Sequence, residues 1–194
     1  MTTNMKRLML GAAALARTAG AALAENVIIG HFGNPTPMQV ARAEGAFDAA
    51  TGWTIEWRQF GSGTEVIAAM ASGDVQVAEL GSSPLAIGTS QGLDIQLFMI
   101  AEGLGTAESL IATKASGITA LEGVKGMRIA VPVGSTAHYS LMGALAHAGI
   151  AETDVTIMNL PADQIAAAWD SGQVDAAFIW EPVQNQILQT GTFI

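Results

Sequence analysis

Short apolar runs alternate with stretches of helical periodicity along almost the whole chain. Helices are predicted at residues 36–47, 64–71, 84–89, 119–124, 136–148, 162–171 and 181–189. Strands are predicted at residues 27–31, 54–60, 75–80, 95–101, 109–113, 127–131, 155–159 and 175–179. This alternation predicts βαβ units and therefore an α/β protein with a mostly parallel sheet.

Several predicted strands are apolar at consecutive positions rather than at alternate ones. Ile129-Ala130-Val131 is one example. Such runs are typical of strands covered on both faces by helices. Sheets of this kind bind ligands at the carboxyl ends of their strands, where the strand order reverses.

One connection differs from the others, because two predicted strands follow each other without a helix between them. The run at 95–101 leads through the Gly-rich sequence EGLGTAE to the run at 109–113. A strand that passes to a second α/β unit would produce this pattern. We therefore expect a first lobe at residues 25–106 and a second lobe at residues 107–194.

The N-terminal residues are typical of a secretory signal peptide. Lys6 and Arg7 precede a short apolar stretch at 8–16, and the small-x-small sequence Ala22-Leu23-Ala24 follows. The apolar stretch is too short for a membrane span. We expect residues 1–24 to be a cleavable signal peptide that directs the protein to the periplasm; an Ala-rich terminal helix is the alternative.

The composition of the chain excludes some classes of binding partner and some kinds of site chemistry. The chain has 194 residues, half of them apolar, and a formal net charge of −9. That charge argues against nucleic acid and anionic membrane surfaces as partners. The sequence contains no cysteine, which excludes disulfides, thiolate catalysis and zinc–thiolate sites.

Three predicted strand-to-helix corners combine small residues with hydroxyls. They are Gly61-Ser62-Gly63, Ser82-Ser83-Pro84 and Ser135-Thr136. Pro84 suits the first position of a helix, which makes Ser83 the expected N-cap. Free N–H groups at such corners bind anions, and each hydrogen bond to a charged partner contributes about 1.5–3 kcal/mol. The alternative is that these residues only cap helices.

Three long segments resemble the periplasmic substrate-binding proteins of taurine and alkanesulfonate ABC importers. They read ASGDVQVAELGSSPLAIGTSQGLDIQLF, GMRIAVPVGSTAHYSLMGAL and IAAAWDSGQVDAAFIWEP. The resemblance runs from Asn26 to the last residue and is strongest to the taurine-binding branch. It implies a type II periplasmic binding fold of two doubly wound lobes, with the ligand between them.

The resemblance also implies which residues bind the ligand. Hydroxyls and N–H groups of both lobes would hold the sulfonate, an acidic side chain would accept from the taurine ammonium, and an aromatic ring would form one wall. The implied ligand-binding residues are Ser82, Ser83, Glu108, Ser135, Thr136, His138, Tyr139 and Trp180.

Each of these residues also has a structural interpretation. Glu108 is a solvated charge in that case, Trp180 packs in a core and His138 caps a helix. The chain also departs from the family pattern. It is shorter than family members and stops soon after the helix that follows Trp180, so we expect the fold to be incomplete at the C-terminus. The segment HFGNPTPMQ, residues 31–39, is richer in Gly and Pro than the taurine branch, which leaves ligand contacts from Phe32–Asn34 open.

We expect a monomeric binding protein, with no catalytic residue, cofactor or metal, that delivers taurine to an inner-membrane permease. A serine hydrolase would need G-x-S-x-G and a dinucleotide-binding enzyme G-x-G-x-x-G, and neither motif is present. His31, His138 and His147 are not at metal-ligand spacing. Another aliphatic sulfonate, nitrate, a pyrimidine precursor, or a fragment without activity remain alternatives.

Overall fold

The structure is a computed structural model that describes residues 26–194. The expected signal peptide at residues 1–24 lies outside the described residues. Within residues 26–194, no helix is both long enough and apolar enough to cross a membrane.

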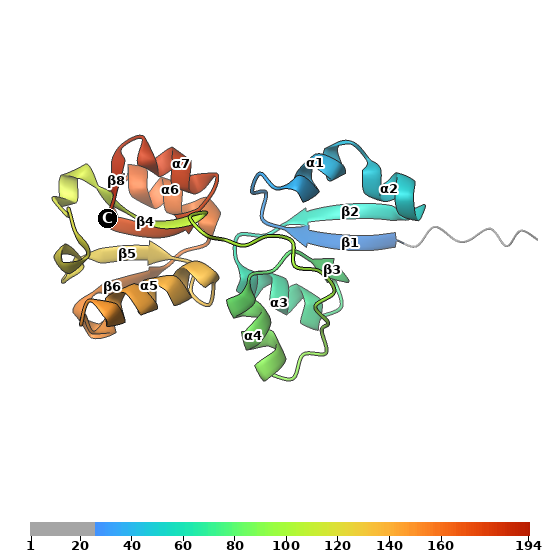
Figure 1. Ribbon diagram of the computed structural model, residues 1–194, viewed down its shortest axis with the longest axis horizontal. Helices are drawn as coiled ribbons and strands as arrows, with labels where there is room; N and C mark the ends of the chain where they lie inside the picture. Colours follow the sequence, from blue (N-terminus) through green and yellow to red (C-terminus); the bar gives the residue numbers. More distant parts are fainter. Residues whose placement is uncertain (1–25) are drawn as a thin grey trace, which may run out of the picture.

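The first half of the molecule, residues 26–90, is built on a three-stranded parallel sheet of order β2-β1-β3. Two short helices cover one face of this sheet and two longer ones lie on the other face (Figure 1). In chain order, the elements are β1 (Asn26–His31), α1 (Pro37–Ala43), α2 (Ala46–Thr51), β2 (Thr54–Gln59), α3 (Gly63–Ala71), β3 (Val77–Ala78) and α4 (Ser82–Ser90).

The second half, residues 108–194, is built on a five-stranded mixed sheet of order β6-β5-β7-β4-β8. The pairs β5–β6 and β5–β7 are parallel, whereas β4 runs antiparallel to both β7 and β8. The elements are β4 (Glu108–Thr113), η1 (Lys114–Ser116), η2 (Leu121–Val124), β5 (Arg128–Val131), α5 (Thr136–His147), η3 (Glu152–Asp154), β6 (Thr156–Asn159), α6 (Ala162–Asp170), β7 (Ala176–Trp180), α7 (Val183–Leu188) and β8 (Gly191–Phe193).

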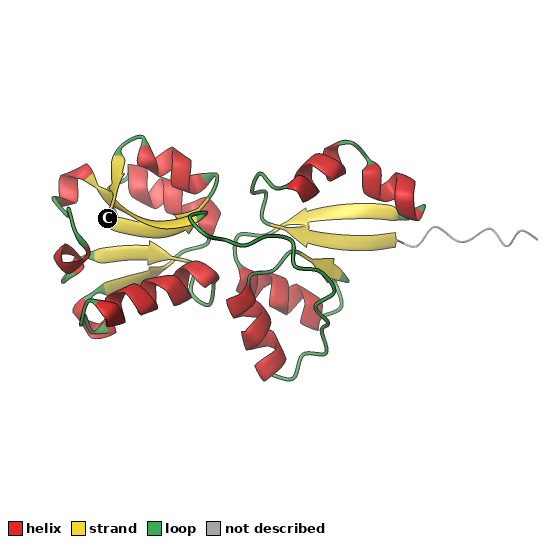
Figure 2. Cartoon of the chain, in the orientation of Figure 1, coloured by secondary structure: helices red, strands yellow, loops and turns green. Residues whose placement is uncertain are grey.

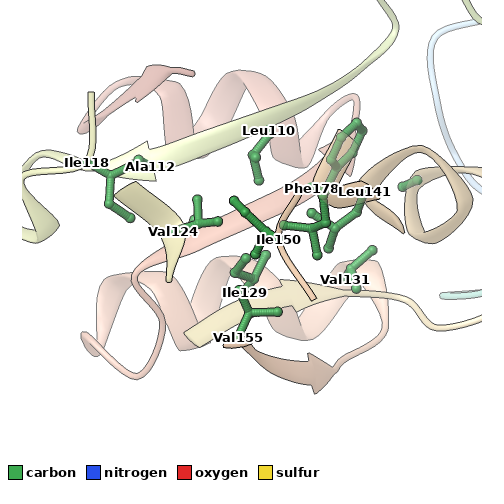
Figure 3. Close-up of a cluster of buried hydrophobic side chains, with 13 residues drawn as sticks. Leu110, Ala112, Ile118, Val124, Ile129, Val131, Leu141, Ile150, Val155 and Phe178 are labelled. Atoms are coloured by element: carbon green, nitrogen blue, oxygen red, sulfur yellow. The ribbon is translucent and has the colours of Figure 1, made fainter. Parts of the chain in front are cut away.

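Both faces of the second sheet are buried, as the consecutive apolar residues of its strands predict. Leu110, Ile129 and Phe178 point to the face that α5 covers (Figure 3). Ile111 and Ile179 point to the opposite face, where they pack with residues of α6 and α7. Since neighbouring residues of a strand face opposite sides, an apolar side chain at every position fills two cores at once.

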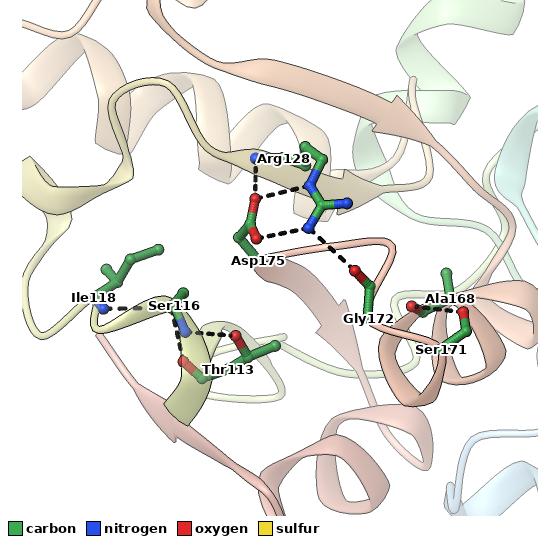
Figure 4. Close-up of polar contacts among 8 residues, drawn as sticks. All are labelled: Thr113, Ser116, Ile118, Arg128, Ala168, Ser171, Gly172 and Asp175. Carbon is green, nitrogen blue, oxygen red and sulfur yellow. Dashed lines mark hydrogen bonds and ion pairs between the residues drawn. The ribbon is translucent and has the colours of Figure 1, made fainter.

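A polar contact joins β5 to β7 at the end of the second sheet where β5 begins. Both carboxylate oxygens of Asp175 accept from the Arg128 guanidinium, at 2.8 and 3.0 Å, and the backbone N–H of Arg128 also donates to this carboxylate (Figure 4). Nη2 of Arg128 further donates to the carbonyl of Gly172. These bonds fix the start of β5 beside the start of β7.

The predicted strand at residues 95–101 is wrong. The connection 91–107 between α4 and β4 forms neither helix nor strand, and it runs as a loop across the molecule (Figure 2). Leu97, Phe98, Met99 and Ile100 are exposed there, Ile100 by 82%. The residues are apolar enough for a strand, but none of the described strands pairs with them.

Some predicted boundaries are also wrong. The helix at 36–47 is divided, because Gly45 adopts a left-handed conformation between α1 and α2. Residues 119–124 form only the short 3-10 helix η2. The sheet of the second half is not mostly parallel, since β4 is antiparallel to its neighbours, and β8 lies beyond the last predicted strand. Other predicted strands and helices agree with the structure to within a few residues.

The two sheets lie side by side, with the carboxyl ends of β1 and β5 pointing to the middle of the molecule (Figure 1). The first sheet draws its strands from residues 26–78 and the second from residues 108–193. A division into lobes between residues 106 and 107 remains a prediction. This arrangement brings the strand-to-helix corners of both halves toward each other.

Candidate functional site

The N-termini of four helices meet where the two halves touch. The backbone N–H of Ala162, at the start of α6, donates to the carbonyl of Gly61, just before α3, at 3.0 Å. The starts of α4 and α5 also lie against each other, as the close approach of Gly81 to Thr136 shows. We call residues 61–64, 81–83, 134–136 and 161–162 the inter-sheet junction.

Glycines make this close approach possible. A Cβ on Gly61 would lie 2.8 Å from Cβ of Pro161, and one on Gly81 would lie 3.0 Å from Cγ2 of Thr136. Gly134 has a φ of +85°, and a Cβ there would lie 2.9 Å from Cγ2 of Thr64. Such distances are too short for ordinary carbon contacts. The glycines of the inter-sheet junction therefore determine how near the two halves come.

Two of the predicted hydroxyls are N-caps. Ser62 caps α3 by accepting from the N–H of Glu65 at 3.3 Å, and Ser135 caps α5 by accepting from the N–H of His138 at 3.1 Å. Both serines are buried. The Glu65 carboxylate also accepts from the N–H of Gly61. The other N–H groups in the first turns of α3 and α5 are not used by these caps, so they can donate to a ligand.

Ser82 and Ser83 lie inside the first turn of α4. The prediction that Ser83 caps this helix is wrong: the N-cap is Gly81, which has no side chain, and the helix begins at Ser82. Pro84 therefore occupies the third helical position, where the missing N–H costs no intrahelical hydrogen bond. Without a side-chain cap, the N–H groups of Ser82 and Ser83 stay available together with their hydroxyls.

Glu108, Thr136 and Trp180 are held together at the edge of the inter-sheet junction. The hydroxyl of Thr136 donates to the Glu108 carboxylate. Glu108 and Trp180 are directly opposite each other in the antiparallel pair β4–β7. Burial raises the pKa of Glu108 above its usual value, and the Thr136 hydrogen bond opposes that rise. The structure thus gathers three residues that the resemblance implies.

Trp180 also contacts the first half of the molecule. Its ring lies edge to face with the ring of Phe32, with 6.1 Å between the ring centroids. Phe32 follows β1 directly, so the contact joins the ends of β1 and β7. This geometry is typical of favourable aromatic pairs. The sequence leaves open whether residues 32–34 contact a ligand, and no local pattern in it predicts the contact between Phe32 and Trp180.

Two predicted ligand residues are placed differently. Tyr139 is 74% exposed on α5, on the opposite side of the helix from its buried residues. His138 is half-buried, and its Nδ1 lies 3.4 Å from the N–H of Gly134. This contact supports a structural role for His138 in the corner that precedes α5.

His31 is buried and has both ring nitrogens engaged. Nδ1 accepts from the N–H of Gly33 at 3.0 Å, and Nε2 lies 2.8 Å from Nη1 of Arg42. Burial, aided by the positive charge of Arg42, lowers the pKa of His31. These contacts place His31 in a structural position within the β1–α1 connection. Residues 26–194 contain no group of three or more His, Asp or Glu side chains placed to hold a metal ion.

The start of α6 is a part of the inter-sheet junction that sequence reasoning missed. The sequence predicts a helix over 162–171, and the structure begins it at Ala162, preceded by Pro161. Gly61 of the first half and Ala162 of the second half, 101 positions apart in the sequence, meet here. The only sequence signal for this corner is that a predicted helix, 162–171, follows a predicted strand, 155–159.

A family model described as the NMT1-like family matches residues 27–193. The taurine-binding periplasmic protein of Escherichia coli is 44% identical over 179 residues, which cover 92% of this chain and 55% of that protein. A putative aliphatic sulfonates-binding protein of Bacillus subtilis is 30% identical over 150 residues, covering 76% of this chain and 45% of that protein. The chain thus spans about half the length of these relatives.

Solved structures with the same fold include two alkanesulfonate-binding proteins. SsuA from Xanthomonas axonopodis, bound to MOPS, has a TM-score of 0.81 and 24% identity over 87% of this chain and 59% of that chain. The periplasmic aliphatic sulphonate binding protein SsuA from Escherichia coli has a TM-score of 0.70 and 26% identity over 88% and 59%. These likenesses confirm the predicted periplasmic binding protein fold, of which the chain covers a part.

Proposed function

The chain belongs to the NMT1-like family, and on that premise we propose that it binds taurine between its two halves and delivers it to an ABC importer permease. Sulfonate-binding proteins are among its relatives, and the 44% identity to a taurine-binding periplasmic protein supports the proposal. The proposal makes two specific claims: the ligand is taurine, and the partner is a permease.

The observation that carries the proposal is the meeting of four helix N-termini at the inter-sheet junction. Each helix start directs unpaired N–H groups and the positive end of its dipole outward. The start of α4 adds the hydroxyls of Ser82 and Ser83, whereas the Thr136 hydroxyl at the start of α5 already donates to Glu108. A tetrahedral anion with three equivalent oxygens suits such a set of donors.

The strength expected of these contacts is sufficient for transport. A hydrogen bond to a charged group contributes about 1.5–3 kcal/mol, and a micromolar complex requires about −8 kcal/mol. Three or four N–H or O–H donors from the inter-sheet junction contribute about 4.5–12 kcal/mol in total, a range that includes this value. A protein with a net charge of −9 can therefore bind an anion locally without a basic patch.

Two residues favour an amino-sulfonate over a simple sulfonate. The partly buried carboxylate of Glu108 uses one oxygen for Thr136, and its other oxygen can accept from an ammonium group. The ring of Trp180 lies directly across the strand pair from Glu108, and an aromatic face also attracts a cation. Taurine carries both the sulfonate and the ammonium that these groups suit.

The proposal places the protein in the periplasm and gives it no catalytic step. The relatives compared above are binding proteins, and the two from Escherichia coli are named as periplasmic. Delivery to a permease requires that the two halves close on the ligand and later release it, which is a hinge motion known for two-lobed binding proteins. The connection 91–107 is the long segment that joins the halves.

Isothermal titration calorimetry with taurine, ethanesulfonate and sulfate tests the proposal. Tighter binding of taurine than of ethanesulfonate is expected, with sulfate weakest. Nitrate or a pyrimidine that binds while every sulfonate fails would contradict the sulfonate assignment. Heat from none of these compounds would indicate that the 194-residue chain does not bind a ligand alone.

A further inference from the structure

Four buried polar atoms without a hydrogen-bond partner lie around the connection from β1 to α1. They are Oδ1 of Asn34, Oγ1 of Thr36, Nε2 of Gln39 and Oε2 of Glu79. A buried polar atom without a partner is costly, so most such atoms in proteins are paired. Thr36 is only 7% exposed, and its hydroxyl does not cap α1. Of these residues, Asn34 and Glu79 are in direct contact.

Glu79 and Asn34 lie together at the carboxyl edge of the first sheet. The N–H of Glu79 donates to the carbonyl of Gly30, which continues the pairing of β1 with β3 by one residue. Nδ2 of Asn34 donates to Oε1 of Glu79 at 3.4 Å. Glu79 stands two residues before Gly81, which touches Thr136 across the inter-sheet junction. The pair is therefore beside the proposed anion site.

No positive charge neutralises the Glu79 carboxylate within the described part of the chain. The ion pairs found among residues 26–194 join Arg58 to Glu56, Lys125 to Asp154 and Arg128 to Asp175. Arg42, on the neighbouring helix α1, is directed elsewhere: it contacts His31 and Gln39 and lies 5.2 Å from the centre of the Trp57 ring.

The surroundings of Glu79 are unfavourable for its negative charge. Burial raises the pKa of Glu79, the Asn34 hydrogen bond opposes this rise, and the negative charge of Glu102 adds to it. A cation bound between these groups would remove the repulsion and pair the free carboxylate oxygen. The two acceptors without partners, Oε2 of Glu79 and Oδ1 of Asn34, both suit an N–H donor with positive charge.

We propose that Glu79, with Asn34 beside it, binds the ammonium group of the amino-sulfonate and so determines its preference over sulfonates that lack an amine. This inference rests on the proposed function, because the sulfonate bound at the inter-sheet junction directs the ammonium to Glu79. An ammonium has three N–H donors, and Glu108 offers it only the oxygen that Thr136 does not occupy. Glu79 supplies a second carboxylate for the same group.

The test compares taurine with ethanesulfonate on the Glu79→Gln variant by isothermal titration calorimetry. Glutamine preserves the size of the side chain, but it loses the charge. The taurine affinity is expected to fall by about tenfold or more, and the ethanesulfonate affinity to change by less than about twofold, since this ligand has no ammonium. The ratio of the two affinities does not depend on how much of the sample is folded.

Two further variants make the result specific. Asn34→Ala removes the second acceptor. It should lower the ratio of taurine affinity to ethanesulfonate affinity, but by a smaller factor than Glu79→Gln does. Glu56→Gln removes an equal charge from an exposed position on β2, and it should leave the ratio unchanged. If Glu79→Gln does not fold, a loss of ratio in Asn34→Ala still supports the proposal and an unchanged ratio contradicts it.

The outcomes separate this inference from the proposed function. A wild-type protein that binds taurine well above ethanesulfonate, with an unchanged ratio in Glu79→Gln, would overturn the role of Glu79 alone. Equal affinities of the wild-type protein for taurine and ethanesulfonate would overturn it as well and leave sulfonate binding intact. A wild-type protein that binds neither compound would overturn both.

Discussion

The hydroxyl of Thr136, in the first turn of α5, donates a hydrogen bond to the carboxylate of Glu108 at the start of β4. This bond joins the start of α5, a proposed source of donors to the anion, to the acid proposed to accept from the ammonium. Because one oxygen of Glu108 is held by Thr136, the other keeps a defined position. In the proposed binding mode, the ammonium of the ligand meets this oxygen while the sulfonate is held by the helix starts of both halves.

Glu108→Gln is expected to lower taurine affinity more than ethanesulfonate affinity. The amide keeps an acceptor for Thr136, but it loses the negative charge that attracts the ammonium. A loss of about tenfold for taurine corresponds to the lower range for a hydrogen bond to a charged group. Calorimetry with both ligands measures the difference, and an equal loss for the two would count against an ammonium at Glu108.

Ser135→Ala is expected to destabilise the protein by about 0.5–2 kcal/mol, the usual cost of losing an N-cap. The buried hydroxyl of Ser135 accepts from the N–H of His138, and alanine leaves that N–H without a partner. Urea denaturation measures the free energy of unfolding. Ser140→Ala is the matched control, because Ser140 is an exposed residue inside α5; the prediction fails if both variants unfold alike.

Gly61→Ala is expected to weaken taurine binding several-fold by separating the two halves. The added Cβ would lie 2.8 Å from Cβ of Pro161 and 3.1 Å from Oδ1 of Asp163. Proline cannot swing away, so the start of α6 must shift from α3. Affinity and unfolding free energy are measured together, and unchanged taurine affinity would show that this contact does not shape the site.

Gly143→Ala provides the control for that experiment. Gly143 is exposed inside α5, and a Cβ there meets no atom within 4 Å. Alanine is a better helix former than glycine, so this variant should be more stable by about 0.5–1 kcal/mol. Its taurine affinity should equal that of the wild type.

Asp175→Asn is expected to lower the melting temperature by a few degrees at pH 7 and to have less effect in acid. Hydrogen bonds from Arg128, in opposition to partial burial, hold the pKa of Asp175 below its usual value of 3.8. Because the folded pKa is depressed, the stabilisation is complete above the unfolded pKa and disappears as the pH falls through the folded one.

Melting curves of the wild type and of Asp175→Asn at pH 7, 5 and 3 check this dependence. The gap between the two proteins should be constant from pH 7 to pH 5 and should shrink below about pH 4. Glu56→Gln removes one partner of an exposed pair with Arg58 and should change stability little at any pH. If the difference in melting temperature between the wild type and Asp175→Asn stays the same below about pH 4, the effect of the substitution is due to packing and not to the ion pair.

Local patterns in the sequence were sufficient for most of the elements and for part of the candidate site. Ile129-Ala130-Val131 was recognisable as a strand covered on both faces because side chains alternate along a strand, so apolar residues at every position require two cores. Ser62 and Ser135 were recognisable at helix starts because their oxygens accept from N–H groups only two or three residues away. Each of these features depends on neighbours in the chain.

The same local signals failed where a distant partner decides the outcome. Residues 95–101 have the composition of a strand, but a strand exists only if another strand pairs with it, and none of those described does. Ser83 precedes a proline as a cap would, yet α4 starts at Ser82. The approach of Gly61 to Pro161, the bond between Asn34 and Glu79 and the contact of Phe32 with Trp180 join residues far apart in sequence. Only the tertiary structure decides such contacts, because they depend on how the two sheets are placed and not on any local pattern of residues.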